Sequence, residues 1–388
     1  MRGTRMNRSY RRRRVALVVF ATILWLLPDV ENPVARAQNA PSAGQDSPSP
    51  KATSGQPDGR GLKSINVVVV DGLGHPVRGL QASDFTLLDN KVPQKLLGFQ
   101  VVEGNSSAAS PVHVVIVADN INTGFGAVAW QREQLNEFLK EDGGVLRYPT
   151  TLGILSESGL KLQKGSTTDG NALLADFNKY QTDLRAINRS GGIYGLAEML
   201  EMSLRQLGQL AAYEATVPGH KLILVISPGW PALARAGDQE DPSERKWVFN
   251  NIVEMTNGLP EANITLYALN PFELGRTDPF FYQGYLKPIA FEKNAEYPHM
   301  SLQVFAAHSG GQVLTTGRDI TSELNTAIRD ASTSYELTFE GAPGDRPNEF
   351  HALQVQVDKP DVKVRTTAGY YANVQLSTQS SAKKAAKN

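Results

Sequence analysis

The sequence predicts an α/β fold with a doubly wound, mostly parallel sheet, flanked by β segments at the N- and C-terminal ends of the fold. Three short apolar runs rich in β-branched residues carry this prediction, at residues 112–119, 221–227 and 264–270. Runs without polar alternation are typical of strands buried on both faces of a parallel sheet. Stretches with helical periodicity lie between them, and this alternation indicates crossover helices on both faces.

The first 37 residues have the pattern of an export signal. Four arginines, residues 11–14, precede a thirteen-residue run, 15–27, that is apolar except for Thr22, and a small-x-small cleavage site follows at 35–37. This pattern predicts a signal peptide over residues 1–37 and an exported protein, periplasmic or secreted. Cleavage is favoured because a membrane span needs about 20 apolar residues. Only an uncleaved segment would bring the chain to a membrane.

The composition excludes several classes of function. The chain has 39 basic and 39 acidic residues and no cysteine. Disulfides, thiolate metal sites and cysteine nucleophiles are therefore excluded. The signal segment holds eight arginines and two acidic residues, which leaves 31 basic against 37 acidic residues in the rest of the chain. That part therefore lacks the basic footprint of a nucleic-acid-binding protein, and no nucleic-acid partner is expected.

The exported part divides into five segments by composition and pattern. They are a disordered linker at 38–62, an N-terminal β module at 63–108, an α/β domain at 109–332, a C-terminal β segment at 333–373 and a disordered tail at 374–388. The linker is rich in Pro, Ser, Gly and Gln, which cannot bury enough apolar surface to order themselves. We expect the two β segments to pack together or against the α/β domain, because a lone hairpin is marginal in water.

The elements follow one another along the chain. Strands are predicted at 65–70, 85–88, 112–119, 152–155, 160–162, 221–227, 264–270, 334–339, 350–357 and 362–365. Helices are predicted at 128–139, 173–180, 194–210, 243–256 and near 299–308. Turn residues bound the strands, and the last helix stops at two glycines, as helices commonly do.

Several of these features together resemble a von Willebrand factor type A (VWA) domain. They are the apolar strand ending in Asp119 with Thr123 four residues later, the turn at 190–192 that opens a helix, and the run 224–227 that enters a glycine turn. The flanks at 69–71, 74–80, 84–85, 89–90 and 369–371 resemble the bacterial VWFA-related subfamily, described chiefly from Acidobacteria. The resemblance covers about residues 64–373 and implies a Rossmann-like VWA domain.

The resemblance also implies a metal-ion-dependent adhesion site, built from an Asp-x-Ser-x-Ser loop, a Thr and a second Asp. Asp119 and Thr123 match this pattern and are the candidate ligands, for Mg²⁺ or Ca²⁺, which prefer oxygen donors. Ile121, Ile193 and Pro228 stand where the other ligands belong, and their side chains cannot bind a cation. The predicted site is therefore degenerate.

Two interpretations of Asp119 remain open. Asn120, Asn122 or Ser227 could supply the missing oxygens if the loops are rearranged. Alternatively, Asp119 only caps the turn and helix after its strand.

A second candidate site is the segment 271–298, which is long for a loop and rich in aromatic residues. Aromatic side chains are common anchors of interfaces, so a binding loop is one hypothesis. The other is that the rings pack on the sheet as a satellite core. The candidate partner-binding residues are Asn122, Trp230, Phe280, Phe281, Tyr282 and Tyr285.

Local signatures of enzymes are missing from the sequence. None of the six histidines pairs with another at metal-binding spacing, and there is no GxSxG, HExxH or P-loop lysine. A triad assembled in space stays open. The sequence thus predicts an exported, non-enzymatic adhesion or interaction protein whose partners are other proteins. The alternatives are a structural or assembly component of the cell envelope without metal binding and, third, a hydrolase with an unrecognised triad.

Overall fold

A computed structural model of the chain describes residues 61–104, 112–179, 192–231, 241–270, 280–315, 317 and 319–374. All of them belong to one compact unit, residues 56–388. The predicted signal peptide lies outside the described residues, as do nearly all of the predicted linker and tail. Within the described ranges, every helix is too short or too polar to cross a lipid bilayer.

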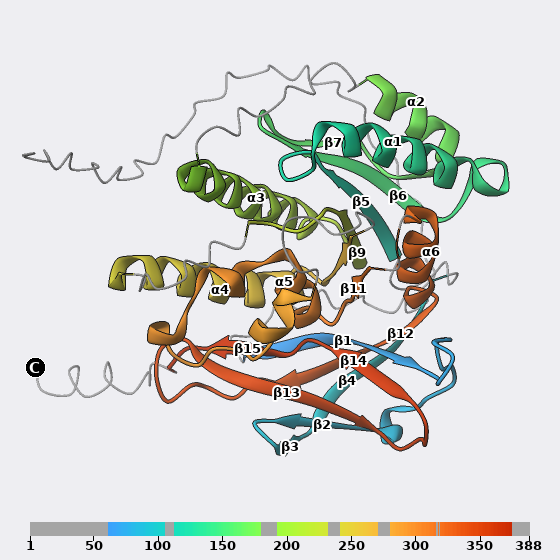
Figure 1. Cartoon of the computed structure of the whole chain (residues 1–388). Helices are drawn as coiled ribbons and strands as arrows, with labels where there is room; N and C mark the ends of the chain where they lie inside the picture. The colour runs from blue at the N-terminus through green and yellow to red at the C-terminus, as the bar shows by residue number, and fades with distance from the viewer. Residues whose placement is uncertain are drawn as a thin grey trace, which may run out of the picture. The chain divides into compact units, whose positions relative to one another are not determined.

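The centre of the fold is a seven-stranded, mostly parallel sheet (Figure 1). Its strands are β5 (Val112–Asp119), β6 (Val145–Ser156), β7 (Gly159–Leu162), β8 (Thr167–Asp169), β9 (His220–Ile226), β10 (Ile264–Leu269) and β11 (Val313–Leu314). The order is β11-β10-β9-β5-β6-β7, with β8 also on β6. β7 and β8 run antiparallel to β6, and the other pairs are parallel. β5, β9 and β10 are buried throughout, which explains their unbroken apolar sequences.

Helices cover both faces of this sheet (Figure 1). They are α1 (Phe125–Lys140), α2 (Gly170–Lys179), α3 (Gly192–Glu214), α4 (Pro242–Glu261), α5 (Leu302–His308) and α6 (Ile320–Asp330). α1, α2 and α6 share a core with one face, and α3, α4 and α5 share a core with the other. The predicted α/β fold with a mostly parallel sheet is confirmed.

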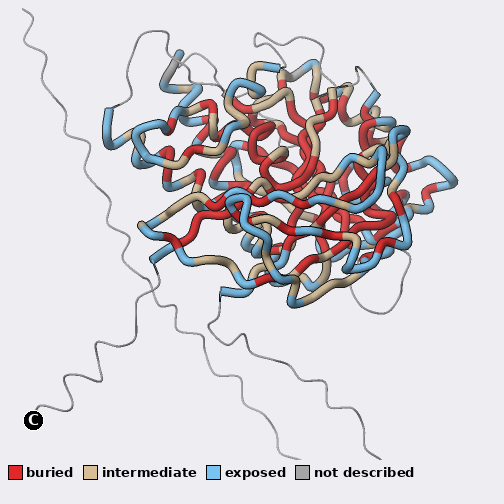
Figure 2. The backbone as a smooth tube through the Cα atoms, turned by 90° about the horizontal axis from the view of Figure 1, so that it is seen from below, coloured by how far each residue is buried: buried red, intermediate tan, exposed pale blue. Residues whose placement is uncertain are grey.

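The terminal β segments build two four-stranded antiparallel sheets, in the orders β14-β1-β12-β4 and β15-β13-β2-β3. Their strands are β1 (Leu62–Val70), β2 (Phe85–Asp89), β3 (Val92–Gln94), β4 (Leu96–Glu103), β12 (Thr333–Glu340), β13 (Glu349–Val357), β14 (Lys363–Thr366) and β15 (Gly369–Ala372). Each sheet combines strands from both ends of the fold. Buried side chains of the two sheets, such as Val67, Phe339, Leu87 and Val355, form one core, so the sheets are a β-sandwich. Figure 2 shows the buried positions gathered in the interior of the fold, with exposed positions around them.

The described structure contains elements that the sequence pattern does not predict. α6, β3, β4, β8, β11 and β15 are missing from the predicted elements, and β6 is several residues longer than predicted. The helix predicted near 299–308 begins at Leu302, after a separate 3-10 turn at Tyr297–Met300.

His220, at the start of β9, gives the fold a testable pH dependence. Its side chain is 2% exposed, and Nε2 lies 2.9 Å from Thr265 Oγ1. Burial, and then the neighbouring Lys221 charge, lowers the pKa of His220 from 6.5 to about 4. As the pH falls below 6.5, His220 becomes protonated in the unfolded chain. In the folded chain it stays neutral until the pH reaches about 4.

Stability should therefore fall between pH 6.5 and pH 4, by up to about 3 kcal/mol from this group. We expect His220→Gln to reduce that loss, as measured by urea unfolding across the same pH range. His299 and His308 also have lowered pKa values because they are buried. The informative quantity is thus the difference between variant and parent, and parallel pH profiles would contradict the assignment.

Candidate functional site

The candidate site lies at the carboxyl ends of β5 and β9, where open α/β sheets bind ligands. β5 and β9 are parallel neighbours, with Ala118 opposite Ile226. Asp119 therefore ends its strand beside Ser227, the first residue after β9.

The Asp119 carboxylate is fully buried and accepts four hydrogen bonds. Oδ1 accepts from the backbone N–H groups of Ile121, at 3.0 Å, and Asn122, at 3.1 Å. Oδ2 accepts from Asn122 Nδ2 at 2.8 Å and from Ser227 Oγ at 2.7 Å. Burial raises the pKa of Asp119, and these bonds act against the rise. The side chain thus holds the turn after β5 and ties it to the turn after β9.

The network continues into helix α3 through a residue that the sequence pattern did not single out. Asn122 Nδ2 also donates to Ser203 Oγ at 2.9 Å, and Ser203 Oγ donates to the carbonyl of Met199 at 2.8 Å. On the other side, Ser227 Oγ accepts from the backbone N–H of Gly229 at 3.0 Å. Ser203 is fully buried among the apolar residues of α3. A single serine among the apolar residues of a helix is a signal that the sequence does contain.

The residues present do not fit the cation site that the resemblance implies. Protein donors occupy both oxygens of Asp119, whereas Mg²⁺ or Ca²⁺ would need those oxygens as ligands. Ile121, at the position of the first serine, is completely buried, and Thr123 is 3% exposed. The described residues contain no group of three acidic, histidine or cysteine side chains placed to hold a metal. The turn at 190–191 lies outside the described residues.

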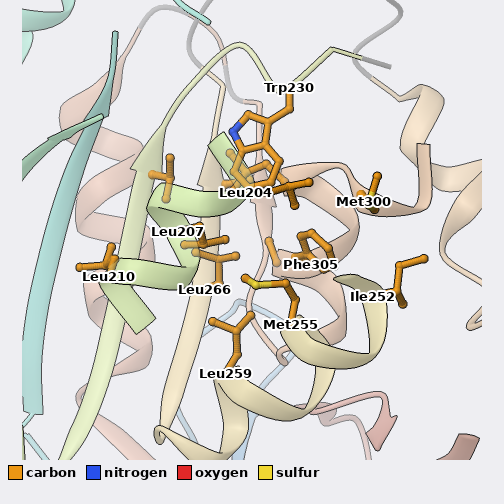
Figure 3. Close-up of a cluster of buried hydrophobic side chains, with 14 of the residues drawn as sticks. Leu204, Leu207, Leu210, Trp230, Ile252, Met255, Leu259, Leu266, Met300 and Phe305 are labelled. Atoms are coloured by element: carbon orange, nitrogen blue, oxygen red, sulfur yellow. The ribbon is translucent and has the colours of Figure 1, made fainter. Parts of the chain in front are cut away.

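Trp230 lies in the hydrophobic core and not at the surface. Its side chain is 3% exposed and its ring meets Phe305 edge-on, with 6.3 Å between centroids. Figure 3 shows the ring above the cluster formed by Leu204 of α3, Met255 of α4 and Phe305 of α5. The partner contact predicted for Trp230 would require the ring to leave this core. Asn122, another predicted contact residue, is half-buried and held by its bonds to Asp119 and Ser203.

The aromatic segment is described from residue 280 onward, and residues 271–279 lie outside the described part. It forms three short 3-10 turns, η5 (Phe281–Tyr285), η6 (Glu292–Asn294) and η7 (Tyr297–Met300). Phe281, Tyr282 and Tyr285 are half-buried, and Tyr285 packs edge-on against His299 at 5.1 Å. Phe280 is 52% exposed. The segment therefore combines rings that pack down with rings that face solvent.

Two further exposed rings, Trp247 and Phe291, and the half-buried ring of Tyr297 lie on or beside α4, η6 and η7, and both turns contact α4. Trp247 of α4 is 38% exposed, and its ring centroid is 6.2 Å from that of Tyr297. Phe291 is 47% exposed, with the Arg346 guanidinium 4.1 Å and the Lys293 ammonium 5.6 Å from its ring centre. We call Trp247, Phe291 and Tyr297 the aromatic surface. It offers apolar area and two cations to a partner.

One acid–histidine–hydroxyl arrangement has the order of a hydrolase triad. His113 Nδ1 lies 3.2 Å from Glu214 Oε2, and His113 Nε2 lies 2.8 Å from Thr151 Oγ1. All three residues are at most 8% exposed, at the end of the sheet opposite Asp119, and Thr151 Oγ1 donates to the Gly165 carbonyl. A substrate would have no access, so this network is better explained as a buried structural one.

Comparisons with known proteins leave the family open. No protein-family model and no curated protein matches the chain. Among solved structures, the human COPII-coat protein Sec24c is similar, with a TM-score of 0.27 and 10% identity over 69% of this chain and 44% of that chain. The chain thus spans less than half the length of that solved chain. A similarity this low carries no argument about fold family or function.

Proposed function

We propose that this chain is an exported, non-enzymatic protein-binding protein built on a VWA-like domain, and that it binds without a metal ion. The doubly wound arrangement, with Asp119 at the end of a central strand, supports the VWA-like assignment. The signal-peptide pattern of residues 1–37 supports export. In this proposal Asp119 stabilises the loops at the end of the sheet and is not a metal ligand.

The observation that carries the binding proposal is the aromatic surface. Interfaces are enriched in Trp, Tyr, Phe and Arg, and a few such side chains supply most of the binding energy. Trp247 and Phe291 expose such rings to solvent on or next to elements that pack on one another, since η6 and η7 contact α4. Arg346 and Lys293 beside Phe291 favour a partner with acidic residues around an apolar centre.

Site-specific photo-crosslinking in the organism of origin tests this proposal. A photoreactive phenylalanine analogue at Phe291 or Trp247 should give a discrete adduct with one protein. A matched control is the same analogue at Val145, which is 71% exposed and lies at the start of β6. The adduct should persist when a chelator removes divalent cations.

Two results would count against the proposal. Equal adducts at Val145 would mean that the aromatic surface has no special partner. An adduct that disappears with chelator and returns with Mg²⁺ would mean that a metal-dependent site governs binding.

A further inference from the structure

A separate pocket of about 440 Å³ lies between the C-terminal part of α4 and the edge of the β-sandwich. Ser64 of β1, Glu336 of β12, Tyr370 of β15 and Thr256 of α4 are among its lining residues. The nearest lining residue of α4, Thr256, is nine residues from Trp247, or about 14 Å along the helix axis, so the pocket is distinct from the aromatic surface.

The pocket contains an unpaired strand edge. On one side β1 pairs with β12 from Leu62 to Val67, whereas on the other side β14 pairs only with Val67 to Val70. Among the described residues, no strand pairs with residues 62–65 of β1 on this second side, and Leu62, Lys63, Ser64 and Ile65 line the pocket. An edge of this kind is a template for an added strand.

The direction of the backbone groups along this edge follows from two hydrogen bonds. The carbonyl of Asn66 accepts from Thr366 Oγ1, on the β14 side, and the carbonyl of Gly61 accepts from the N–H of Gly341, on the β12 side. In an antiparallel strand the N–H and C=O of one residue point to the same side, and successive residues alternate. Leu62 and Ser64 thus direct their backbone groups to the free edge.

Asn257, another lining residue of the pocket, already makes a strand-like pairing. Asn257 of α4 accepts from the N–H of Tyr371 with Oδ1 and donates to its carbonyl with Nδ2, both at 2.9 Å. The side-chain amide thereby takes the place of a neighbouring strand at the edge of β15. Residues 62–65 of β1 have no such partner among the described residues.

The charges of the lining favour a cation. Lys63 Nζ lies 3.5 Å from Glu261 and 4.8 Å above the centre of the Tyr370 ring. Glu336 is half-buried, and within the described part of the chain its carboxylate forms no ion pair or hydrogen bond. With Lys63 and Glu261 paired, one negative charge remains uncompensated.

A buried hydroxyl is a further polar group without a partner. Thr256 is 4% exposed, and its Oγ1 makes no hydrogen bond to any described residue. An unsatisfied buried hydroxyl is costly, so a ligand that bonds to it would be stabilised.

We propose that this pocket binds an extended peptide segment of a partner protein, which adds to β1 as a strand and places a lysine or arginine side chain against Glu336. The pocket volume suits a ligand of a few residues, and strand addition is an established mode of peptide recognition. The inference does not depend on the aromatic surface or on the VWA-like assignment.

The first test uses a fluorescent, acetylated seven-residue peptide with valine and threonine alternating around a central arginine. Its binding to the full chain is measured by fluorescence anisotropy. N-methyl groups on one alternating set of peptide amides should weaken binding about tenfold or more, because they remove the bonds to β1. N-methyl groups on the other alternating set of amides, which face away from β1, should change the affinity little. Equal effects of both sets, or no binding at millimolar concentration, would overturn the proposal.

Two variants test the recognition residues. Glu336→Gln should lower the affinity for the arginine peptide about fivefold and leave the affinity for the same peptide with a central glutamine unchanged. Glu103 is an exposed acidic residue on β4, and Glu103→Gln should change neither affinity. Ser64→Pro removes the N–H that faces the pocket and should block binding, with thermal melting used to verify folding. Binding that survives Ser64→Pro would contradict strand addition. Equal affinity for free arginine amide would assign the pocket to a small cation instead.

Discussion

Replacing Asp119 by alanine is expected to lower the free energy of unfolding by about 3 to 5 kcal/mol, which is large for a single substitution. The variant leaves Ser227 Oγ, the Asn122 amide and two backbone N–H groups without their acceptor. Each lost bond contributes about 1 kcal/mol, and burial of the unpaired donors adds to the loss. Urea unfolding at neutral pH measures it.

The metal hypothesis is tested in the same experiment. The unfolding curves of the parent and of Asp119→Ala should be unchanged between chelator and millimolar Mg²⁺ or Ca²⁺. Stabilisation of the parent by a cation, lost in the variant, would show that Asp119 binds metal after all.

Asp119→Asn is the matched control, because it keeps a side-chain oxygen for the two backbone N–H groups and should cost less than alanine. It also removes the titration of the site. Since burial raises the folded pKa above the unfolded value of 3.8, protonation of Asp119 favours the folded state. The stabilisation that protonation of Asp119 adds is fully present below pH 3.8 and is lost as the pH rises through the folded pKa. The asparagine variant should lack this contribution.

The sequence predicts the strands that are buried along their whole length, because such strands are continuous apolar runs. β5, β9 and β10 are continuous apolar runs, because each is covered by helices on both faces. That Asp119 lies beside the end of β9 depends on β5 and β9 being neighbours in the sheet, and the sequence pattern does not predict the strand order. The sequence does not predict which groups donate hydrogen bonds to the Asp119 carboxylate. The position of Asn122, one of the donors, depends on its bond to Ser203 of α3.

The sequence pattern does not predict elements that depend on contacts with residues far away in the sequence. α6 has apolar residues at helical spacing, but Ser, Thr and Asn between them equally favour turns. β4 is mostly exposed or half-buried and exists because it pairs with β12, far away in the sequence. The burial of Trp230 likewise depends on Phe305 of α5. In each case tertiary contacts determine the secondary structure or the burial that the local sequence pattern does not specify.

A buried ion pair joins α6 to the β-sandwich. Asp330 Oδ2 accepts from Arg365 Nη2 and from the Tyr267 hydroxyl, both at 2.8 Å, and from Gln312 Nε2 at 3.0 Å. The side chains of Asp330 and Arg365 are 5% and 20% exposed. Asp330 thus links α6, β10 and β14, and burial together with its charge raises the pKa of Tyr267 well above the usual value.

Asp330→Ala should therefore lower the free energy of unfolding by about 3 to 5 kcal/mol, because it leaves the Arg365 charge in a poorly solvated site without its partner. Arg365→Met alone should also destabilise the fold, since it removes a donor from Asp330. The double variant should recover part of the loss, because no buried charge then lacks a partner. Urea unfolding of the four proteins gives a coupling free energy, for which we expect about 2 kcal/mol. Strictly additive losses would show that the two side chains stabilise the fold independently, and that the contact between α6 and the sandwich depends on apolar packing alone.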